Sequence, residues 1–329
     1  MNSCLCFLIY LARSGSTLLA SELDRYESIG VTLEENVPDG IKKGKQIKIK
    51  DSKALTNYLE EIYNDTKFQA WGINKTELKN TILKSCLFPL RYRDILHAIH
   101  SLYFAEYKPD MIIHKQGNYC FFIEKVRMEF PMGKFLFIDR DPRAIHNSQK
   151  KNINSISEKS MNHGIIQFAL IYKRMQQIIR YYRYDKFVYV LNYENLVNRN
   201  NEELQSILNF LEIKPTIKEE KKSYYSRIPE QQKPLHQNIR SNYNSSRTAG
   251  WRNELEPHRI AFLQTVLRKE LLDKGFKLYS FPIHKFSMVQ KMMFIYWLVR
   301  YLILYNLLRI THWNYFSFRK GAFRKFGYG

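Results

Sequence analysis

CLCFLIYLARSGSTLL, residues 4–19, joins an apolar run to a short loop of small polar residues. The run over residues 4–12 has the uninterrupted apolar character of a strand buried on both faces of a parallel sheet. The loop 13–16 follows it directly, and the helical spacing of residues 17–26 predicts a helix after the loop. Such a strand–loop–helix lets backbone N–H groups approach phosphate oxygens, and the helix dipole favours the anion. It is not a Walker A loop, because the GxxxxGKS/T pattern is absent.

Apolar runs and stretches of helical spacing alternate along the rest of the chain. Further buried strands are predicted at residues 111–114, 134–139 and 186–192. Helices are predicted at residues 51–64, 90–106, 118–130, 162–184 and 202–211. Residues 37–50, rich in Lys and Gly, and residues 213–246, polar and interrupted by Pro, are predicted to be loops. The alternation predicts an α/β fold, with a P-loop-like parallel sheet flanked by helices.

The charge and cysteine content narrow the class of protein. A formal net charge of +21 over 329 residues indicates a polyanionic partner or an anionic surface. Charge alone leaves nucleic acid, acidic lipid, acidic glycan and a multiply charged nucleotide open. Four scattered cysteines without a CxxC pair indicate neither a disulfide framework nor a zinc site, so we expect a reducing cytoplasm. The first apolar run lacks the basic region and cleavage site of a signal peptide, so we expect none there.

Residues 281–329 differ in character from residues 1–280, which we expect to form the main domain. From His284 onward the chain has eight Lys or Arg, thirteen aromatic residues and no Asp or Glu. Residues 292–308 are nearly all apolar, but Arg300 makes them a poor membrane-spanning helix. Two interpretations stay open: a helix packed on the core, or a peripheral element lying on an anionic membrane with its aromatic residues at the interface.

A second motif, FLFIDRDPRA at residues 135–144, begins within a predicted strand. Pro142 suits the first turn of a helix. Arg140 then stands at the carboxyl edge of the sheet, where ligands bind in open α/β sheets. Ser148 lies about two turns along that helix, where it can face the same pocket. The alternative is a surface ion pair between Arg140 and Asp141.

Together the two motifs resemble the PAPS-dependent sulfotransferase superfamily, where PAPS is 3′-phosphoadenosine 5′-phosphosulfate. The motif style is closest to the carbohydrate and tyrosyl-protein sulfotransferases, whose 5′-phosphosulfate loop commonly reads Arg-Ser-Gly-Ser/Thr-Thr. The second motif is similar to the 3′-phosphate element, including the eight-residue gap from Arg140 to Ser148. VLNYENL at 190–196 resembles the family's strand ending in Tyr-Glu-Asp-Leu, and RTAGWR at 247–252 its late Gly-x-Trp-Lys/Arg segment. Order and spacing agree over residues 4–255.

The resemblance implies PAPS as co-substrate and adenosine 3′,5′-bisphosphate as product. The 5′-phosphate and sulfuryl group would be held by Arg13, Ser14, Gly15, Ser16, Thr17 and Leu18. The 3′-phosphate would be held by Arg140 and Ser148 with help from Arg247, and the adenosine would contact Tyr193. Tyr193 could instead be an ordinary half-buried aromatic at a strand end.

The resemblance also implies the catalytic groups. Glu34 lies twenty-one residues after Arg13, where these branches commonly place the Glu that accepts the acceptor's proton. Glu35 could hold this role instead, or both could be solvated loop carboxylates. Lys115 stands at the position of the family's Lys-Thr-Pro or Lys-Asp-Pro segment, although the Pro is missing here. It would neutralise charge on the bridging oxygen. Arg13 and Lys115 supply positive charge, so no metal is expected.

The leading hypothesis is therefore a cytoplasmic sulfotransferase, peripheral to the membrane, that acts on a hydroxyl group of a carbohydrate or glycolipid. The nearest alternative is sulfation of a small-molecule or lipid alcohol. A P-loop kinase is disfavoured because the Walker Lys is absent. A different class is a non-catalytic basic protein that binds nucleic acid or acidic membrane. No motif typical of RNA or DNA binding is found, so we expect no nucleic-acid partner.

Overall fold

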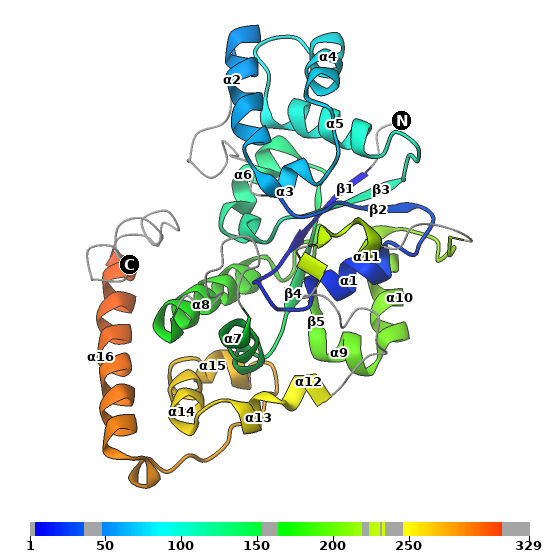
Figure 1. Cartoon of the computed structure of the whole chain (residues 1–329). Helices are drawn as coiled ribbons and strands as arrows, with labels where there is room; N and C mark the ends of the chain where they lie inside the picture. The colour runs from blue at the N-terminus through cyan, green and yellow to red at the C-terminus, as the bar shows by residue number, and fades with distance from the viewer. Residues whose placement is uncertain are drawn as a thin grey trace.

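A five-stranded parallel sheet forms the centre of the protein in a computed structural model (Figure 1). The structure describes residues 4–35, 48–152, 164–218, 224–230, 232–233 and 246–310. The strands are β1 (Cys4–Ile9), β2 (Ile29–Val31), β3 (Met111–Lys115), β4 (Lys134–Asp139) and β5 (Val188–Asn192). Their order is β2-β3-β1-β4-β5, and every neighbouring pair is parallel. The predicted parallel sheet flanked by helices is confirmed.

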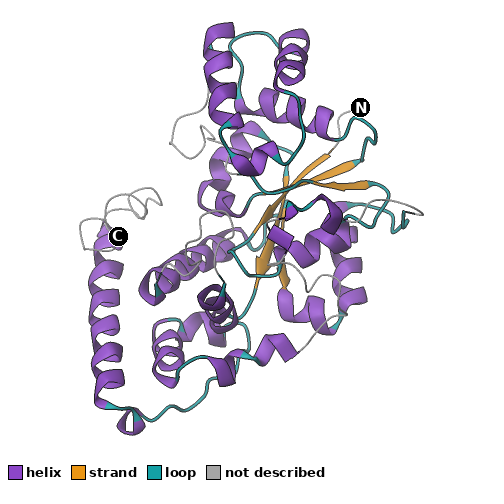
Figure 2. Cartoon of the chain, viewed as in Figure 1, coloured by secondary structure: helices purple, strands orange, loops and turns teal. Residues whose placement is uncertain are grey.

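Helices lie on both faces of the sheet (Figure 2). Before β4 the chain forms α1 (Ser16–Leu23), α2 (Ser52–Tyr63), α3 (Thr66–Gln69), α4 (Lys75–Ser85), α5 (Tyr92–Tyr103), the 3₁₀ helix η1 (Gly117–Phe122) and α6 (Ile123–Glu129). After β4 come α7 (Pro142–Lys151), α8 (Ile165–Tyr182), α9 (Tyr193–Asn198), α10 (Asn200–Leu211), α11 (Tyr224–Arg227), α12 (Ser246–Ala249), α13 (Trp251–Glu254), α14 (Pro257–Val266), α15 (Arg268–Leu272) and α16 (Met288–Ile310).

The central strand β1 contributes side chains to the core on both faces of the sheet. Phe7 and Ile9 pack with α6, α8 and α14, whereas Cys6 and Leu8 pack on the other face with α1, α2 and α10. All four side chains are fully buried, which explains the uninterrupted apolar run, since successive strand residues face opposite sides. Because the strands are parallel, the segments that follow β1, β3, β4 and β5 meet at one edge of the sheet.

The structure differs from the sequence-based elements in several places, and one of them is the short helix α11, which lies within the loop expected at residues 213–246. The predicted helix at residues 118–130 divides into η1 and α6. Strand β2 and helices α4 and α14 were not predicted. Three residues are too short to show a period, and the periodic signal of α4 and α14 is weak. Of the loop expected at 37–50, residues 37–47 lie outside the described part of the chain.

In the described part of the tail, the short 3₁₀ helix η3 (Ile283–Lys285) is followed by the long helix α16, which packs on α8 and α14. Trp297 lies with its ring centroid 5.2 Å from that of His258 and 5.8 Å from that of Phe262 on α14. One face of α16 is thus part of the core of the main domain, as the first of the two interpretations of the tail expected. Residues 311–329 lie outside the described part of the chain.

Candidate active site

The loop after β1 turns sharply into α1. The Ser14 N–H donates to the Leu11 carbonyl over 3.0 Å, and Arg13 and Gly15 have the positive φ angles 73° and 102°. A Cβ atom on Gly15 would lie 2.3 Å from the Tyr193 ring, so only glycine fits there. Helix α1 has no side-chain cap at its start, so its first N–H groups are available to an anion.

The element after β4 contacts this loop directly. An Arg140 guanidinium nitrogen donates to the Arg13 carbonyl over 2.9 Å, and Arg13 Nε donates to Ser148 Oγ over 3.1 Å. The Arg140 guanidinium lies 4.1 Å from the centroid of the Tyr193 ring, a cation–π contact. The structure therefore brings together Arg13, Arg140, Ser148 and Tyr193 from three segments of the chain, which follow β1, β4 and β5. Tyr193 is buried and also limits the space over Gly15.

Asp141 does not form a surface ion pair with Arg140. It is buried and pairs with Arg143, whose guanidinium nitrogen lies 2.8 Å from the carboxylate. The same guanidinium lies 4.1 Å from the centroid of the Trp251 ring and donates to Gln264 Oε1 over 2.8 Å. This network ties α7 to the segment that contains Trp251. The cation–π contact with Arg143 explains why position 251 is aromatic. The network also gives Arg143 a structural role that the sequence analysis missed.

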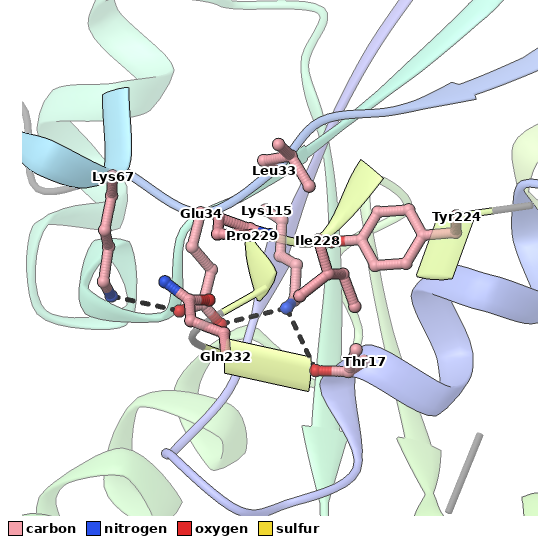
Figure 3. A pocket seen from close by; sticks show the side chains of 9 residues that line it. All are labelled: Thr17, Leu33, Glu34, Lys67, Lys115, Tyr224, Ile228, Pro229 and Gln232. Carbon is pink, nitrogen blue, oxygen red and sulfur yellow. Dashed lines mark hydrogen bonds and ion pairs between the residues drawn. The ribbon is translucent and has the colours of Figure 1, made fainter. Parts of the chain in front are cut away.

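Glu34 lies in a pocket at the carboxyl edge of the sheet (Figure 3). Its Oε1 accepts from the Tyr10 hydroxyl over 2.6 Å and from Lys115 Nζ over 2.9 Å, and its Oε2 accepts from Lys67 Nζ over 3.2 Å. Lys115 Nζ also donates to Thr17 Oγ1 over 3.2 Å. The Lys115 ammonium thus links the helix after the first loop to the carboxylate, and both predicted groups share one pocket.

The charges around Glu34 decide its protonation state. Burial raises the pKa of this carboxyl, but the ammonium groups of Lys115 and Lys67 and the hydrogen bond from Tyr10 outweigh burial and hold the pKa well below its usual range. Burial lowers the pKa of Lys115, and the Glu34 charge opposes this. Glu34 is therefore a carboxylate at neutral pH, which is the form that can accept a proton, and its lowered pKa makes it a weaker base than an ordinary glutamate.

Glu35 faces away from this pocket. Its side chain is buried, and its Oε1 lies 3.5 Å from His114 Nε2. The other ring nitrogen of His114 lies 3.2 Å from His100 Nε2. Neither Glu34 nor Glu35 is a freely solvated loop carboxylate. The two side chains make different contacts, and of the two only Glu34 lines the pocket with Lys115 and Thr17.

Other predicted residues occupy different places. Leu18 packs its side chain against the core, so only its backbone N–H in the first turn of α1 suits an anion. Arg247 belongs to α12, but its side chain lies outside the described part of the chain. In the described residues no group of three or more His, Cys, Asp or Glu could hold a metal ion.

The pocket also includes residues that the sequence analysis missed. Lys67 comes from the four-residue helix α3, and its position beside Glu34 depends on how α2 to α5 pack over the sheet edge. No local pattern separates Lys67 from the many other lysines. The remaining wall of the pocket is formed by Leu33, Tyr224, Ile228, Pro229 and Gln232.

Comparisons with known proteins identify the family and the fold of the chain. A family model described as "Sulfotransferase family" matches residues 6–219. The search of curated proteins returned no match. The solved sulfotransferase domain of the Synechococcus PCC 7002 olefin synthase is 16% identical with a TM-score of 0.55, covering 85% of this chain and 97% of that one. The sulfotransferase domain from the curacin biosynthetic pathway is 13% identical with a TM-score of 0.49, covering 85% and 99%. The family match spans more than half of the sequence, and the chain belongs to the sulfotransferase family.

Proposed function

We propose that this sulfotransferase moves a sulfuryl group from PAPS to a hydroxyl group of a sugar or glycolipid. The observation that carries the proposal is the contact of Lys115 Nζ with both Glu34 and Thr17. This contact places a proton acceptor, Glu34, next to a cation, Lys115, and both lie beside the start of α1, which suits an anion. Sulfuryl transfer needs these two charged groups.

The residues around the first loop fit the donor nucleotide. Ser14 is fully buried, and its hydroxyl has no hydrogen-bond partner among the described residues. A phosphate oxygen of the donor can accept a hydrogen bond from this hydroxyl. Gly15 and the uncapped start of α1 admit an anion close to the backbone. Arg13 and Arg140 supply two guanidinium groups at this edge. Bound there, PAPS would supply the sulfuryl group.

Two side chains of the protein, Glu34 and Lys115, would carry the chemical step. Glu34 accepts the proton that the acceptor hydroxyl loses as its oxygen bonds to sulfur. Lys115 stabilises the negative charge left on the bridging oxygen when the bond from that oxygen to sulfur breaks. Tyr10 and Lys67 hold the carboxylate in place.

One observation favours a second acceptor class, a small-molecule or lipid alcohol. Leu33, Ile228 and Pro229 make part of the pocket wall apolar, which suits an alcohol with an apolar body. The similarly folded Synechococcus domain belongs to an olefin synthase. Turnover of radiolabelled PAPS with a panel of glycans, glycolipids and small alcohols tests both classes. We propose a cytoplasmic location, which the four free cysteines support.

The donor assignment predicts that adenosine 3′,5′-bisphosphate binds at least ~10-fold more tightly than AMP, because a lost charged hydrogen bond costs ~1.5–3 kcal/mol. Arg140→Ala should remove most of this difference. Isothermal titration calorimetry measures both affinities, with the exposed Arg199→Ala as control. Equal affinities of the unaltered protein for the two nucleotides would refute the 3′-phosphate site.

Lys67 should lower the pKa of the proposed base, Glu34. Tyr10 just after β1, Lys115 at the end of β3 and Lys67 in α3 surround the carboxylate. Removing the Lys67 ammonium raises the pKa of Glu34, because that charge helps to hold it down. A base works only when deprotonated, so we expect Lys67→Ala to lose kcat/KM at a higher pH on the acid side than the unaltered enzyme does.

The measurement is the pH profile of kcat/KM. Lys75→Ala is the matched control, because Lys75 pairs with Glu60 on the neighbouring helix, outside the pocket. An acid limb that stays in place in Lys67→Ala would mean that Lys67 does not act on the titrating group.

A further inference from the structure

The side of α16 that faces away from the core is apolar. Ten residues between 288 and 307 are exposed, and all of them except Asn306 are apolar or aromatic. We call these nine the outer face; they include Met292, Ile295, Val299 and Leu302. A contiguous exposed apolar surface of this kind is uncommon on a soluble protein and marks an interaction site.

The opposite side of the helix is already occupied. Phe294, Trp297, Tyr301 and Leu304 are buried in the core cluster with α8 and α14. Between Met288 and Arg309 the helix is long and apolar enough to cross a membrane by length and composition. Crossing would strip its inner side from α8 and α14 and would carry Arg300 through the bilayer. Packing therefore leaves only the outer face for a partner.

The charges of the tail identify that partner. Lys291, Arg300 and Arg309 are the only charged residues of α16, and all are basic. The sequence has no acidic residue from position 284 to 329. Two copies joined through this face would bring like charges together, whereas an anionic bilayer complements them. Figure 1 shows α16 along one edge of the molecule, with one side facing no other helix or strand of the described residues.

We propose that the outer face of α16 docks the protein on the surface of an anionic lipid bilayer, with the helix lying in the interface. The apolar side chains enter the boundary between headgroups and acyl chains, and the basic side chains reach the headgroup phosphates. Tyr296, on the exposed side, is a residue type that favours this interface. Docking would hold the sulfotransferase domain against the membrane without a spanning segment.

The full-length chain tests the proposal by co-sedimentation with vesicles. We expect binding to vesicles of equal parts phosphatidylglycerol and phosphatidylcholine, weak binding to pure phosphatidylcholine, and release at high salt. Val299 and Leu302 are 50% and 49% exposed, so glutamate can replace them without disturbing the core. The double variant Val299→Glu and Leu302→Glu should lower the partition coefficient by at least about 10-fold.

The matched control adds the same two charges elsewhere. Leu83 in α4 and Leu87 just after α4 are both exposed. Figure 1 shows α4 on the other side of the sheet from α14 and α16. Leu83→Glu with Leu87→Glu should keep most of the vesicle binding. If both double variants lose vesicle binding equally, the loss is caused by the added negative charge and not by the outer face. That result would overturn the proposal.

Two other outcomes would also overturn the proposal. The first is failure of the intact protein to bind anionic vesicles. The second is a dimer in analytical ultracentrifugation that the Val299→Glu and Leu302→Glu variant dissociates, with no vesicle binding by either form. That result would assign the face to a second copy of the chain. Both double variants should keep the thermal stability of the unaltered protein, because all four replaced side chains are exposed.

Discussion

Glu34→Gln should keep nucleotide binding and lower kcat by ~10²-fold or more. The amide retains the size of the side chain, and its oxygen can still accept hydrogen bonds from Tyr10 and Lys115. Only the hydrogen bond from Lys67 to Oε2 is lost, because the amide nitrogen is a donor. The amide cannot take up the proton of the acceptor hydroxyl. Steady-state kinetics with saturating PAPS, together with calorimetry of adenosine 3′,5′-bisphosphate, separate the loss in the chemical step from any loss in binding.

Glu35→Gln is the matched control. Its carboxylate is buried beside His114 and does not line the pocket with Lys115 and Thr17. We expect it to affect stability more than kcat, because it alters a buried polar cluster outside the pocket. A kcat that falls in Glu35→Gln and not in Glu34→Gln would move the base by one residue. Unaltered kcat in both variants would exclude a carboxylate base from this segment.

Lys115→Ala should be the other variant with a large effect, lowering kcat by ~10²–10³-fold, as removal of one preorganised charge-stabilising donor does. The Lys115 ammonium is almost fully buried and lies between Glu34 and Thr17, so neither solvent nor an exposed lysine replaces it. Single-turnover kinetics with preformed donor complex measure this effect on the chemical step.

The same substitution also acts on Glu34. Loss of the Lys115 charge raises the pKa of the carboxyl, so the acid limb of the pH profile should move to higher pH, as in Lys67→Ala. The two lysines then differ in one respect: only Lys115 should lower kcat on the pH plateau. If Lys67→Ala and Lys115→Ala lose kcat equally on the plateau, the special role of Lys115 at the bridging oxygen is wrong. Thermal unfolding of each variant controls for the loss of a buried group.

The fold was predictable because its decisive motifs are contiguous. An apolar run followed by Arg-Ser-Gly-Ser specifies a buried strand, a tight turn and a helix start within a single stretch of chain. The turn demands a glycine at position 15, where φ is 102° and the Tyr193 ring lies close above the backbone. Strand β2 was not predictable, because three residues carry no period and its pairing with β3 is a long-range contact.

The candidate site was predictable in part. Glu34, Lys115, Arg140 and Ser148 could be proposed from the resemblance to the sulfotransferase superfamily. They meet in the structure because parallel strands bring their carboxyl ends to one edge of the sheet. The choice between the adjacent carboxylates could not be made, because backbone direction at Glu34 and Glu35 depends on packing beyond β2.

The sequence by itself therefore determined the parallel α/β fold, the family and the residues at the strand ends. Each of these depends on residues near one another in the chain, or on the common direction of the strands. Only the tertiary structure placed Lys67 and Tyr10 on the Glu34 carboxylate, paired Asp141 with Arg143, and divided α16 into a buried and an exposed apolar side. These are contacts between segments far apart in sequence, and packing decides them through shape and burial, which leave no periodic signal in the chain.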